Sequence, residues 1–176
     1  MGMEKEAAES EQRFAAYVER LSSVMGHADR KRPLNDYCTG LMMPLERKSV
    51  EPLAALTSPG HACAQHQSLL HFVGSSPWND EDVLAEVRAM VLPSIERQGP
   101  IEAWIIDDTA TPKKGKHSVG VAHQYCGQLG KQANCQASVS LSLANHHASL
   151  PVAWRLYLPQ EWTKDRERCK DRKSVV

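Results

Sequence analysis

The chain has 176 residues, of which 41% are hydrophobic, and its 21 basic residues balance its 21 acidic residues. This length and composition allow one ordinary domain, or a small domain joined to part of another, and exclude disorder throughout. The start of the chain is charged, no apolar run approaches the roughly 20 residues of a membrane span, and the five scattered cysteines form no CxxC pair, so we expect a cytoplasmic protein with free thiols and no membrane partner.

Helical periodicity dominates the first part of the chain. Apolar residues between Phe14 and Met25 fall on one helical face, with charges opposite, and Gly26 is expected to end that helix. A basic linker is expected from 28 to 33, followed by a second helix from 34 to 43 that stops before Pro44.

Two further short helices are predicted at 49–56 and 65–73, separated by a turn at 57–60. Helix, turn and helix is the outline of a DNA-reading module. The alternative is a pair of packed helices in an all-helical domain, and most helical pairs are of that kind. This pattern alone therefore favours simple packing over groove reading.

A strong helix start follows at 75–82, where cap candidates, an early proline and acidic residues occur together. The apolar positions continue to Pro93, which is expected to end the helix, and Gln98-Gly-Pro100 then breaks the chain. We place a domain boundary there, which gives a helical N-terminal region at 1–98 and a second domain at 99–170.

Beyond this boundary the spacing of apolar residues changes from a period of 3.6 residues, typical of helices, to a period of 2 residues, typical of strands. A short buried strand is predicted at 103–107, a half-buried strand at 136–143, and a third strand at 152–158 after a turn at 145–149. Sequential strands with a short turn favour an antiparallel hairpin or meander. The expected fold class is therefore α+β or α/β, with helices first and strands after them.

The carboxylate pair Asp107 and Asp108 ends the first predicted strand, and no Asp or Glu follows between Thr109 and Gln160. A carboxylate on a strand can hold Mg²⁺, which commonly takes one or two carboxylates together with phosphate oxygens and water. Adjacent strand residues point to opposite faces, so only one of the two is expected to be a ligand. The alternative is a strand that simply ends in a solvated loop.

The acid-free block carries five positive charges and no negative ones, so it is the place to expect an anionic partner such as a phosphate backbone. The alternative for its lysine run is a solvated hairpin loop. The absence of acids over the next 43 residues, 118–160, favours a functional surface. The candidate phosphate-binding residues are Lys113, Lys114, Lys116, His117, Lys131 and Arg155.

Two other groupings suggest chemistry less strongly. His61, Cys63 and His66 do not have the spacing of two zinc-ligand pairs, so we interpret them as ordinary residues. Cys126 with His123 resembles a nucleophile and its base, but no third orienting group is in sight, and a buried thiol is the better interpretation.

A long motif begins at Ile105 as Ile-Ile-Asp-Asp-Thr-Ala-Thr-Pro-Lys-Lys-Gly-Lys-His-Ser-Val-Gly, and related segments follow at 134–141 and 148–159. Together they resemble the DDE-superfamily transposases of bacterial insertion sequences. Segments 47–52 and 76–78 resemble the same family, so the likeness covers nearly the whole chain up to about Asp165.

The resemblance implies a helical region followed by a ribonuclease-H-like catalytic domain. Such a domain cuts transposon ends and joins the freed 3′-hydroxyl to target DNA, with two Asp and one Glu around Mg²⁺ (or Mn²⁺). By the family pattern the Asp before Thr109 is the first acid, which is Asp108, with Asp107 as the fallback. The implied partners are terminal-repeat and target DNA, and the full-length protein would be a possible homo-oligomer.

The family pattern places the second Asp on a later strand and the Glu on a helix beyond it. Here the third predicted strand is followed only by a charge-dense tail that contains Glu161, Asp165, Glu167 and Asp171, without strand periodicity. We therefore expect a fragment that carries the first three strands of the nuclease core and no strand-transfer activity of its own. The last strand should present an unpaired edge and an apolar face without a covering helix, which favours aggregation.

Residues 171–176 read Asp-Arg-Lys-Ser-Val-Val, which is the translation of part of a common sequencing-adapter sequence, so we expect them to be non-native. Two alternatives to a transposase fragment stay open at this point. One is a non-catalytic DNA-binding protein, and the other is a related phosphodiester nuclease that does not transpose.

Overall fold

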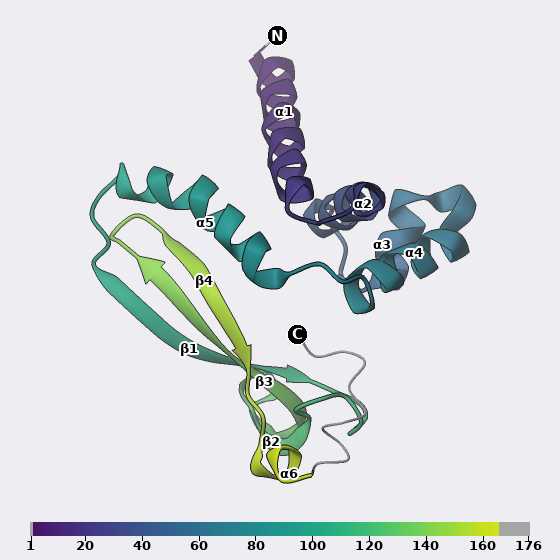
Figure 1. Ribbon diagram of the computed structural model, residues 1–176, viewed down its shortest axis with the longest axis vertical. Coiled ribbons are helices and arrows are strands. Elements are labelled where there is room, and N and C mark those ends of the chain that lie inside the picture. The colour runs from purple at the N-terminus through teal and green to yellow at the C-terminus, as the bar shows by residue number, and fades with distance from the viewer. Residues whose placement is uncertain (1, 166–176) are drawn as a thin grey trace. The chain divides into compact units, whose positions relative to one another are not determined.

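A computed structural model describes residues 2–165, and the chain divides into two compact units between Glu86 and Val87. The first unit is helical, and the second combines helix with an antiparallel sheet, so the fold class is α+β (Figure 1). The division falls inside helix α5 (Asp80–Glu96), earlier than the boundary expected after Gln98. The adapter-like segment 171–176 lies outside the described residues. Within residues 2–165, no helix is both long and apolar enough to cross a membrane.

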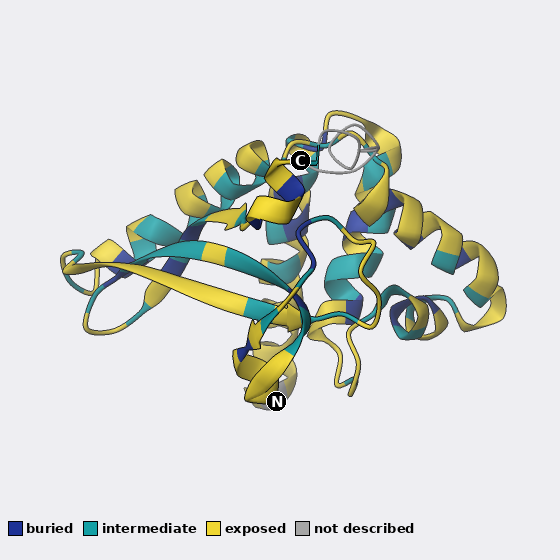
Figure 2. Cartoon of the chain, turned by 90° about the horizontal axis from the view of Figure 1, so that it is seen from below, coloured by how far each residue is buried: buried dark blue, intermediate teal, exposed yellow. Residues whose placement is uncertain are grey.

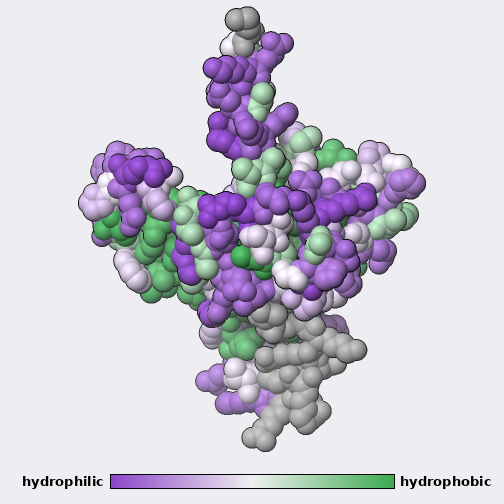
Figure 3. All heavy atoms as spheres, turned by 45° about the horizontal axis from the view of Figure 1, so that its top comes forward, coloured by the Kyte–Doolittle hydropathy of each residue, from purple (hydrophilic) through white to green (hydrophobic). Residues whose placement is uncertain are grey.

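The helices of the first unit follow the predicted periodicity. Val18, Leu21 and Met25 are buried along one face, whereas the first half of α1 is exposed and hydrophilic (Figure 3). The basic linker predicted at 28–33 is instead helical, because the His27 side chain caps a short turn and the first turn of α2 tolerates Pro33. The elements are α1 (Gly2–Ser23), η1 (Ala28–Arg30), α2 (Lys31–Met42), α3 (Val50–Thr57), η2 (Pro59–His61) and α4 (Ala62–Gly74).

Helices α2, α3 and α4 share a small core. Leu53, Ala54 and Leu69 are fully buried. Gly40 is required at the α2–α3 contact, since a Cβ there would lie 2.7 Å from a Leu53 methyl carbon. The buried Gln65 amide donates 2.8 Å to Asp36 Oδ2 and 3.2 Å to Thr57 Oγ1, so its polar group is satisfied. The two predicted helices are thus a packed pair, and groove reading by either stays a prediction.

Helix α5 continues through Pro93 to Glu96, which corrects the predicted end at the proline. Pro93 removes only one backbone donor, and the following turn is held by Arg97 N–H donating to the Pro93 carbonyl at 3.2 Å. Ile95 in this turn is buried against the sheet of the second unit. Packing of this last turn therefore outweighs the local cost of the proline.

The sheet of the second unit is built on a long central strand, β3. One edge of β3 pairs with β1, and Cys135 pairs with both Pro112 and Ala122, so β2 lies at the opposite edge. β4 pairs with residues 138–144 of β3 at the same edge as β2, farther along the strand. All pairings are antiparallel. The strands are β1 (Ala103–Pro112), β2 (Ala122–Cys126), β3 (Lys131–Ala144) and β4 (Ser149–Leu156).

The predicted strands are present, but their bounds differ. β1 and β3 are longer than predicted, β4 begins and ends earlier, and β2 was not predicted at all. The β2 sequence, Ala-His-Gln-Tyr-Cys, has no clear apolar alternation, and its strand state depends on pairing with Lys131–Cys135 of β3. A short α6 (Gln160–Thr163) follows β4, and its buried Trp162 donates 2.8 Å from Nε1 to the Val121 carbonyl.

One face of the sheet is covered by α5. Ile95 packs with Leu150 and Val152 of β4, and with Leu141 and Leu143 of β3. This confirms the predicted apolar alternation of β3. The helix covers the Leu150 and Val152 side of β4. Trp154, on the predicted apolar side of the third strand, pairs with Ser140 and lies on the opposite face, where it is 42% exposed, so an uncovered apolar face there stays a prediction.

The first strand is exposed rather than buried, which corrects the prediction of a buried strand. Every residue from Ala103 to Thr109 is exposed, including Trp104 at 72% and Ile106 at 74% (Figure 2). Among the described residues β1 pairs only with β3, so its other edge is open. The apolar run had predicted burial, but no described element packs over it.

The turn between β3 and β4 is tied to the end of α5 by Asn145. Its Nδ2 donates 2.9 Å to each of the Ile95 and Gly99 carbonyls, and its Oδ1 accepts from His147 N and Ala148 N at 2.9 and 3.0 Å. One side chain therefore holds both the β3–β4 turn and the junction from α5 to β1.

We predict that Asn145→Ala destabilises the second unit by about 2–3 kcal/mol, because it leaves two part-buried carbonyls and two turn amides without their partner. Asn145→Asp keeps the acceptor but places a carboxylate oxygen against the two carbonyl oxygens that Nδ2 bonds, so its cost should be at least as large. Urea unfolding followed by circular dichroism measures both. Equal stability of Asn145→Ala and the unchanged chain would contradict this role.

We also predict that Ile106→Lys reduces self-association of the chain while it changes the free energy of unfolding by less than about 0.5 kcal/mol. A lysine on an open edge opposes strand pairing between copies, and the native side chain contributes little burial. Sedimentation velocity over a range of concentrations measures the effect. Leu70→Lys, at an exposed apolar position of α4, is the matched control and should leave association unchanged.

Candidate metal and phosphate site on the sheet

Asp108 lies in the middle of β1 rather than at its end, because the strand continues to Pro112. Its side chain is exposed, and its carboxylate has no hydrogen-bond or ion-pair partner within residues 2–165. The neighbouring Asp107 differs, since its Oδ1 accepts a hydrogen bond of 2.9 Å from the Asp108 backbone N–H. Of the two carboxylates, Asp108 is thus the one with both oxygens available to a ligand.

The strand register places Asp108 in a row with one cation. Val139 of β3 pairs with Asp108 on one side and with Arg155 of β4 on the other. Directly opposite residues in antiparallel strands share a face, so all three side chains lie on one face of the sheet. Two strand spacings separate the Asp108 and Arg155 backbones by about 10 Å. Asp107 pairs with Ser140 and lies on the opposite face.

The row lies just beyond the part of the sheet that α5 covers. Arg88 of α5 donates 3.2 Å from Nη1 to the carbonyl of Val152, the residue bulged out of the β3–β4 pairing. Val152 itself is buried under α5, whereas Val139 is 36% exposed and Arg155 is exposed. An open strip of sheet therefore remains, with a carboxylate at one side and a guanidinium at the other.

The residues present do not complete a metal site. Within residues 2–165 no group of three or more His, Cys, Asp or Glu side chains could hold a metal ion. Asp107 and Asp108 cannot chelate one ion together, because they lie on opposite faces. A carboxylate is the oxygen donor that Mg²⁺ prefers, but this face of the sheet offers one such donor and no more.

The lysine-rich segment follows Asp108 along the same strand and forms the β1–β2 connection. Lys113 N–H donates 2.8 Å to the Asn134 carbonyl at its start, and Trp162 holds the Val121 carbonyl at its end. Lys114, Lys116 and His117 are exposed between these anchors.

The predicted phosphate-binding residues are therefore only partly brought together. Arg155 shares a face of the sheet with Asp108, and Lys113, just past the end of β1, lies five residues or about 16 Å from Asp108. Lys131 begins β3 and lies eight residues, about 26 Å, from the Asp108 row. It lies at the same end of the sheet as Lys113, which bonds to Asn134 three residues farther along β3.

Sequence reasoning missed Arg88, which joins α5 to the bulge in β4. The only sequence signal for it is one basic residue among the apolar positions of that helix. It also missed that Arg155 shares a face with Asp108, because this follows from the register of three strands that lie far apart in sequence.

The two cysteines on β2 and β3, Cys126 and Cys135, are structural. Cys126 and Cys135 are fully buried, and the Cys126 thiol contacts the Ala110 carbonyl at 3.7 Å. Burial raises the pKa of the Cys135 thiol above its ordinary value. His123 and Cys126 are three residues apart on β2 and point to opposite faces, so they form no nucleophile and base pair. The predicted buried thiol is confirmed.

We predict that a thiol reagent modifies the exposed Cys63 in the folded chain, while Cys126 and Cys135 react only after unfolding. The reason is the exclusion of reagent, reinforced at Cys135 by the raised pKa, which keeps the thiolate population low below that pKa. Iodoacetamide labelling with peptide mass spectrometry, with and without urea, reads each site separately. Rapid native labelling of Cys135 would contradict the buried arrangement.

Comparison with known proteins gives one family. The family model described as DDE superfamily endonuclease matches residues 20–175. A curated relative, the probable transposase for insertion sequence element IS701 of Microchaete diplosiphon, is 30% identical over 122 residues, which is 69% of this chain and 30% of the relative. The chain therefore spans less than a third of the length of that relative. No solved structure matches the chain.

Proposed function

The chain belongs to the DDE endonuclease superfamily, and from this membership we propose that it is one portion of an insertion-sequence transposase. The parent protein would cut transposon ends and join them to target DNA by metal-dependent phosphodiester transfer. The sheet of the second unit would be the start of a ribonuclease-H-like nuclease core. The observation that carries the proposal is Asp108, exposed in mid-strand in the row with Val139 and Arg155.

Asp108 would be the first acidic ligand of the metal ions, with Asp107 as the fallback. Mg²⁺ or Mn²⁺ is the expected ion, and it would polarise the scissile phosphate and activate the attacking oxygen when bound. A phosphate over this strip would be repelled by Asp108 and attracted by Arg155. Asp108 is therefore compatible with a bound phosphate only when a cation lies between the carboxylate and the phosphate. Arg155, on the other side of the strip from Asp108, would orient the DNA backbone.

The exposed lysines of the β1–β2 connection would hold DNA beyond the reacting phosphate. Lys114, Lys116 and His117 lie on a connection anchored at both ends, so their charges are presented without a neighbouring acid in the sequence. The helical unit would contribute recognition of terminal-repeat DNA. We further propose that the parent acts in the cytoplasm and as an oligomer.

The second Asp and the Glu of the catalytic set would lie in sequence that this chain does not include. Three observations support this part of the proposal. The chain spans 30% of its relative's length. The sheet offers one carboxylate on the Asp108 face, and the apolar β1 has an open edge. The chain on its own would then be unable to hold two metal ions in line with a phosphodiester.

The test is a comparison of two proteins. The 176-residue chain should show no Mg²⁺-dependent cleavage of duplexes that carry insertion-sequence ends. The protein expressed from the genomic reading frame continued past residue 170 should cleave them, and Asp108→Ala should lower its rate by about 10³-fold or more, because metal binding and charge stabilisation are lost together.

Asp107→Ala is the matched control, since it removes a carboxylate from the opposite face of the same strand. Activity lost in Asp107→Ala and kept in Asp108→Ala would reverse the assignment. Cleavage by the 176-residue chain that depends on Asp108 would contradict the incomplete site.

A further inference from the structure

A cavity of about 340 Å³ in the helical unit has the lining of an anion site. It lies between the η1 turn and start of α2 on one side and α4 with the segment after it on the other. Its polar side chains are almost all hydrogen-bond donors or hydroxyls, and it contains no lysine or glutamate. The lining residues are His27, Asp29, Arg30, Pro33, Ser68, His71, Phe72, Ser76 and Pro77.

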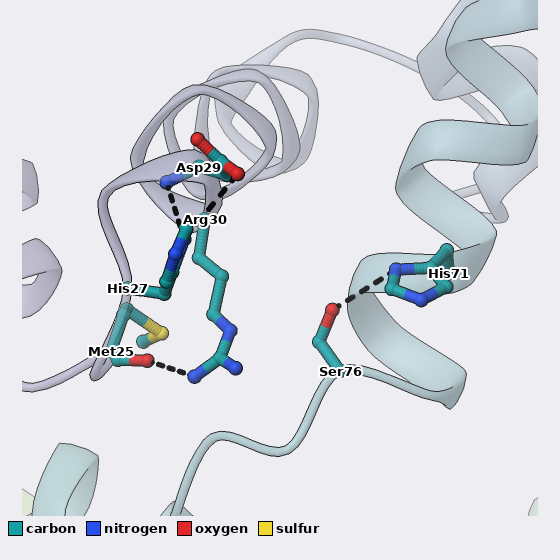
Figure 4. A network of polar contacts seen from close by, with 6 residues as sticks. All are labelled: Met25, His27, Asp29, Arg30, His71 and Ser76. Atoms are coloured by element: carbon teal, nitrogen blue, oxygen red, sulfur yellow. Dashed lines mark hydrogen bonds and ion pairs between the residues drawn. The ribbon is translucent and has the colours of Figure 1, made fainter.

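Arg30 is held in place at this cavity by two backbone carbonyls. Its Nη1 donates to the Met25 carbonyl (Figure 4). The same nitrogen donates to the Pro77 carbonyl at 3.3 Å. Gly26 permits this approach. Its φ of +74° disfavours other residues, and a Cβ added at this position would lie only 3.2 Å from Arg30 Nη1. Fixing one nitrogen orients the guanidinium and leaves the other N–H groups to a ligand.

Both histidines of the cavity have their Nδ1 atoms engaged. His27 Nδ1 accepts from the Asp29 backbone N–H at 3.2 Å, and His71 Nδ1 lies 3.2 Å from the Ser76 hydroxyl. Where Nδ1 accepts, as at His27, the ring N–H lies on Nε2 and can be donated to a ligand, and the same holds for His71 when the Ser76 hydroxyl is the donor. The Asp29 carboxylate, 3.4 Å from His27 Nδ1, is the one acidic group, and its side chain is 89% exposed to screening solvent.

The cavity floor is apolar and rigid. Phe72 is buried and stacks on Trp78 with ring centroids 5.9 Å apart, and Trp78 Nε1 donates 2.9 Å to the Phe72 carbonyl. A phosphate alone would occupy only part of the volume. The hydrogen-bond donors on the walls suit a phosphate, and the aromatic floor with the two prolines suits the sugar attached to it.

We propose that this cavity binds a phosphodiester of the DNA backbone, with Arg30, His27 and His71 as donors and the sugar over Phe72. This rests on the proposed function in one respect, which is that DNA is the partner of the parent protein. The cavity lies entirely in the helical unit, so it is a contact independent of the Asp108 row.

The experiment uses the 176-residue chain and a fluorescently labelled duplex, with binding measured by anisotropy as a function of salt. Ser68→Glu places a carboxylate in the cavity from an exposed position on α4 and should weaken binding about tenfold. It should also lower the slope of log affinity against log salt by about 1, the loss of one phosphate contact. Gln67→Glu adds the same charge next to it on α4, outside the cavity lining, and should have little effect.

His71→Gln is a second variant that adds no charge and should weaken binding in the same direction. Equal effects of Ser68→Glu and Gln67→Glu would overturn the proposal. A second outcome would also overturn it. Inorganic phosphate would change the chemical shifts of Ser76 and His71, while the variants would leave DNA affinity unchanged, which would indicate a site for free phosphate.

Two outcomes separate this proposal from the proposed function. If Lys113→Ala with Lys114→Ala weakens DNA binding while Ser68→Glu does not, the cavity proposal fails and the DNA-handling sheet stands. If the unchanged chain binds no duplex at low salt, the cavity proposal and the DNA role of this chain fail together.

Discussion

The relation between Asp108 and Arg155 depends on the antiparallel pairing of β3 with a strand on each of its edges. Val139 is the residue that both pairings share. A shift of either register by one residue would move Asp108 or Arg155 to the opposite face. The β3–β4 register is held by packing, because Leu141 and Leu143 of β3 and Leu150 of β4 must all face α5 for the core with Ile95 to form. The apolar core of the second unit thus fixes the Arg155 side of the polar strip, whereas the exposed β1 is held by its backbone pairing with β3.

The periodic elements could be predicted from the sequence, and the elements that depend on partners could not. The alternation of β3 and the apolar faces of α1 and α5 are local patterns, and the structure confirms them. β2 is a strand only because β3 pairs with it, and the last turn of α5 survives Pro93 only because Ile95 is buried. Asp108 could be singled out by its motif, whereas its relation to Arg155 requires knowledge of two registers.

The acid-free segment has two physical consequences. It leaves Asp107 and Asp108 as the only carboxylates on the four strands, since 109–160 contains neither Asp nor Glu. The segment that follows Asp108 therefore carries no acidic residue of its own that would repel a polyanion. The same absence means that a metal ion at Asp108 finds no second carboxylate on the sheet. One compositional feature thus supports both the DNA partner and the need for further ligands.

The exposed apolar run of β1 is a separate argument that further structure packs over this strand in the proposed parent protein. A strand that reads Ala-Trp-Ile-Ile without alternation is typical of a strand buried on both faces. Trp104 and Ile106 remain largely exposed on the α5 side of the sheet, and Ile105 is exposed on the other. Full burial of each such side chain would contribute about 1.5–3 kcal/mol, which is large beside the usual net stability of a small domain. A larger sheet in the proposed parent protein would bury this strand, and Asp108 would then lie on an inner strand, where a rigid backbone can hold a metal ligand in place.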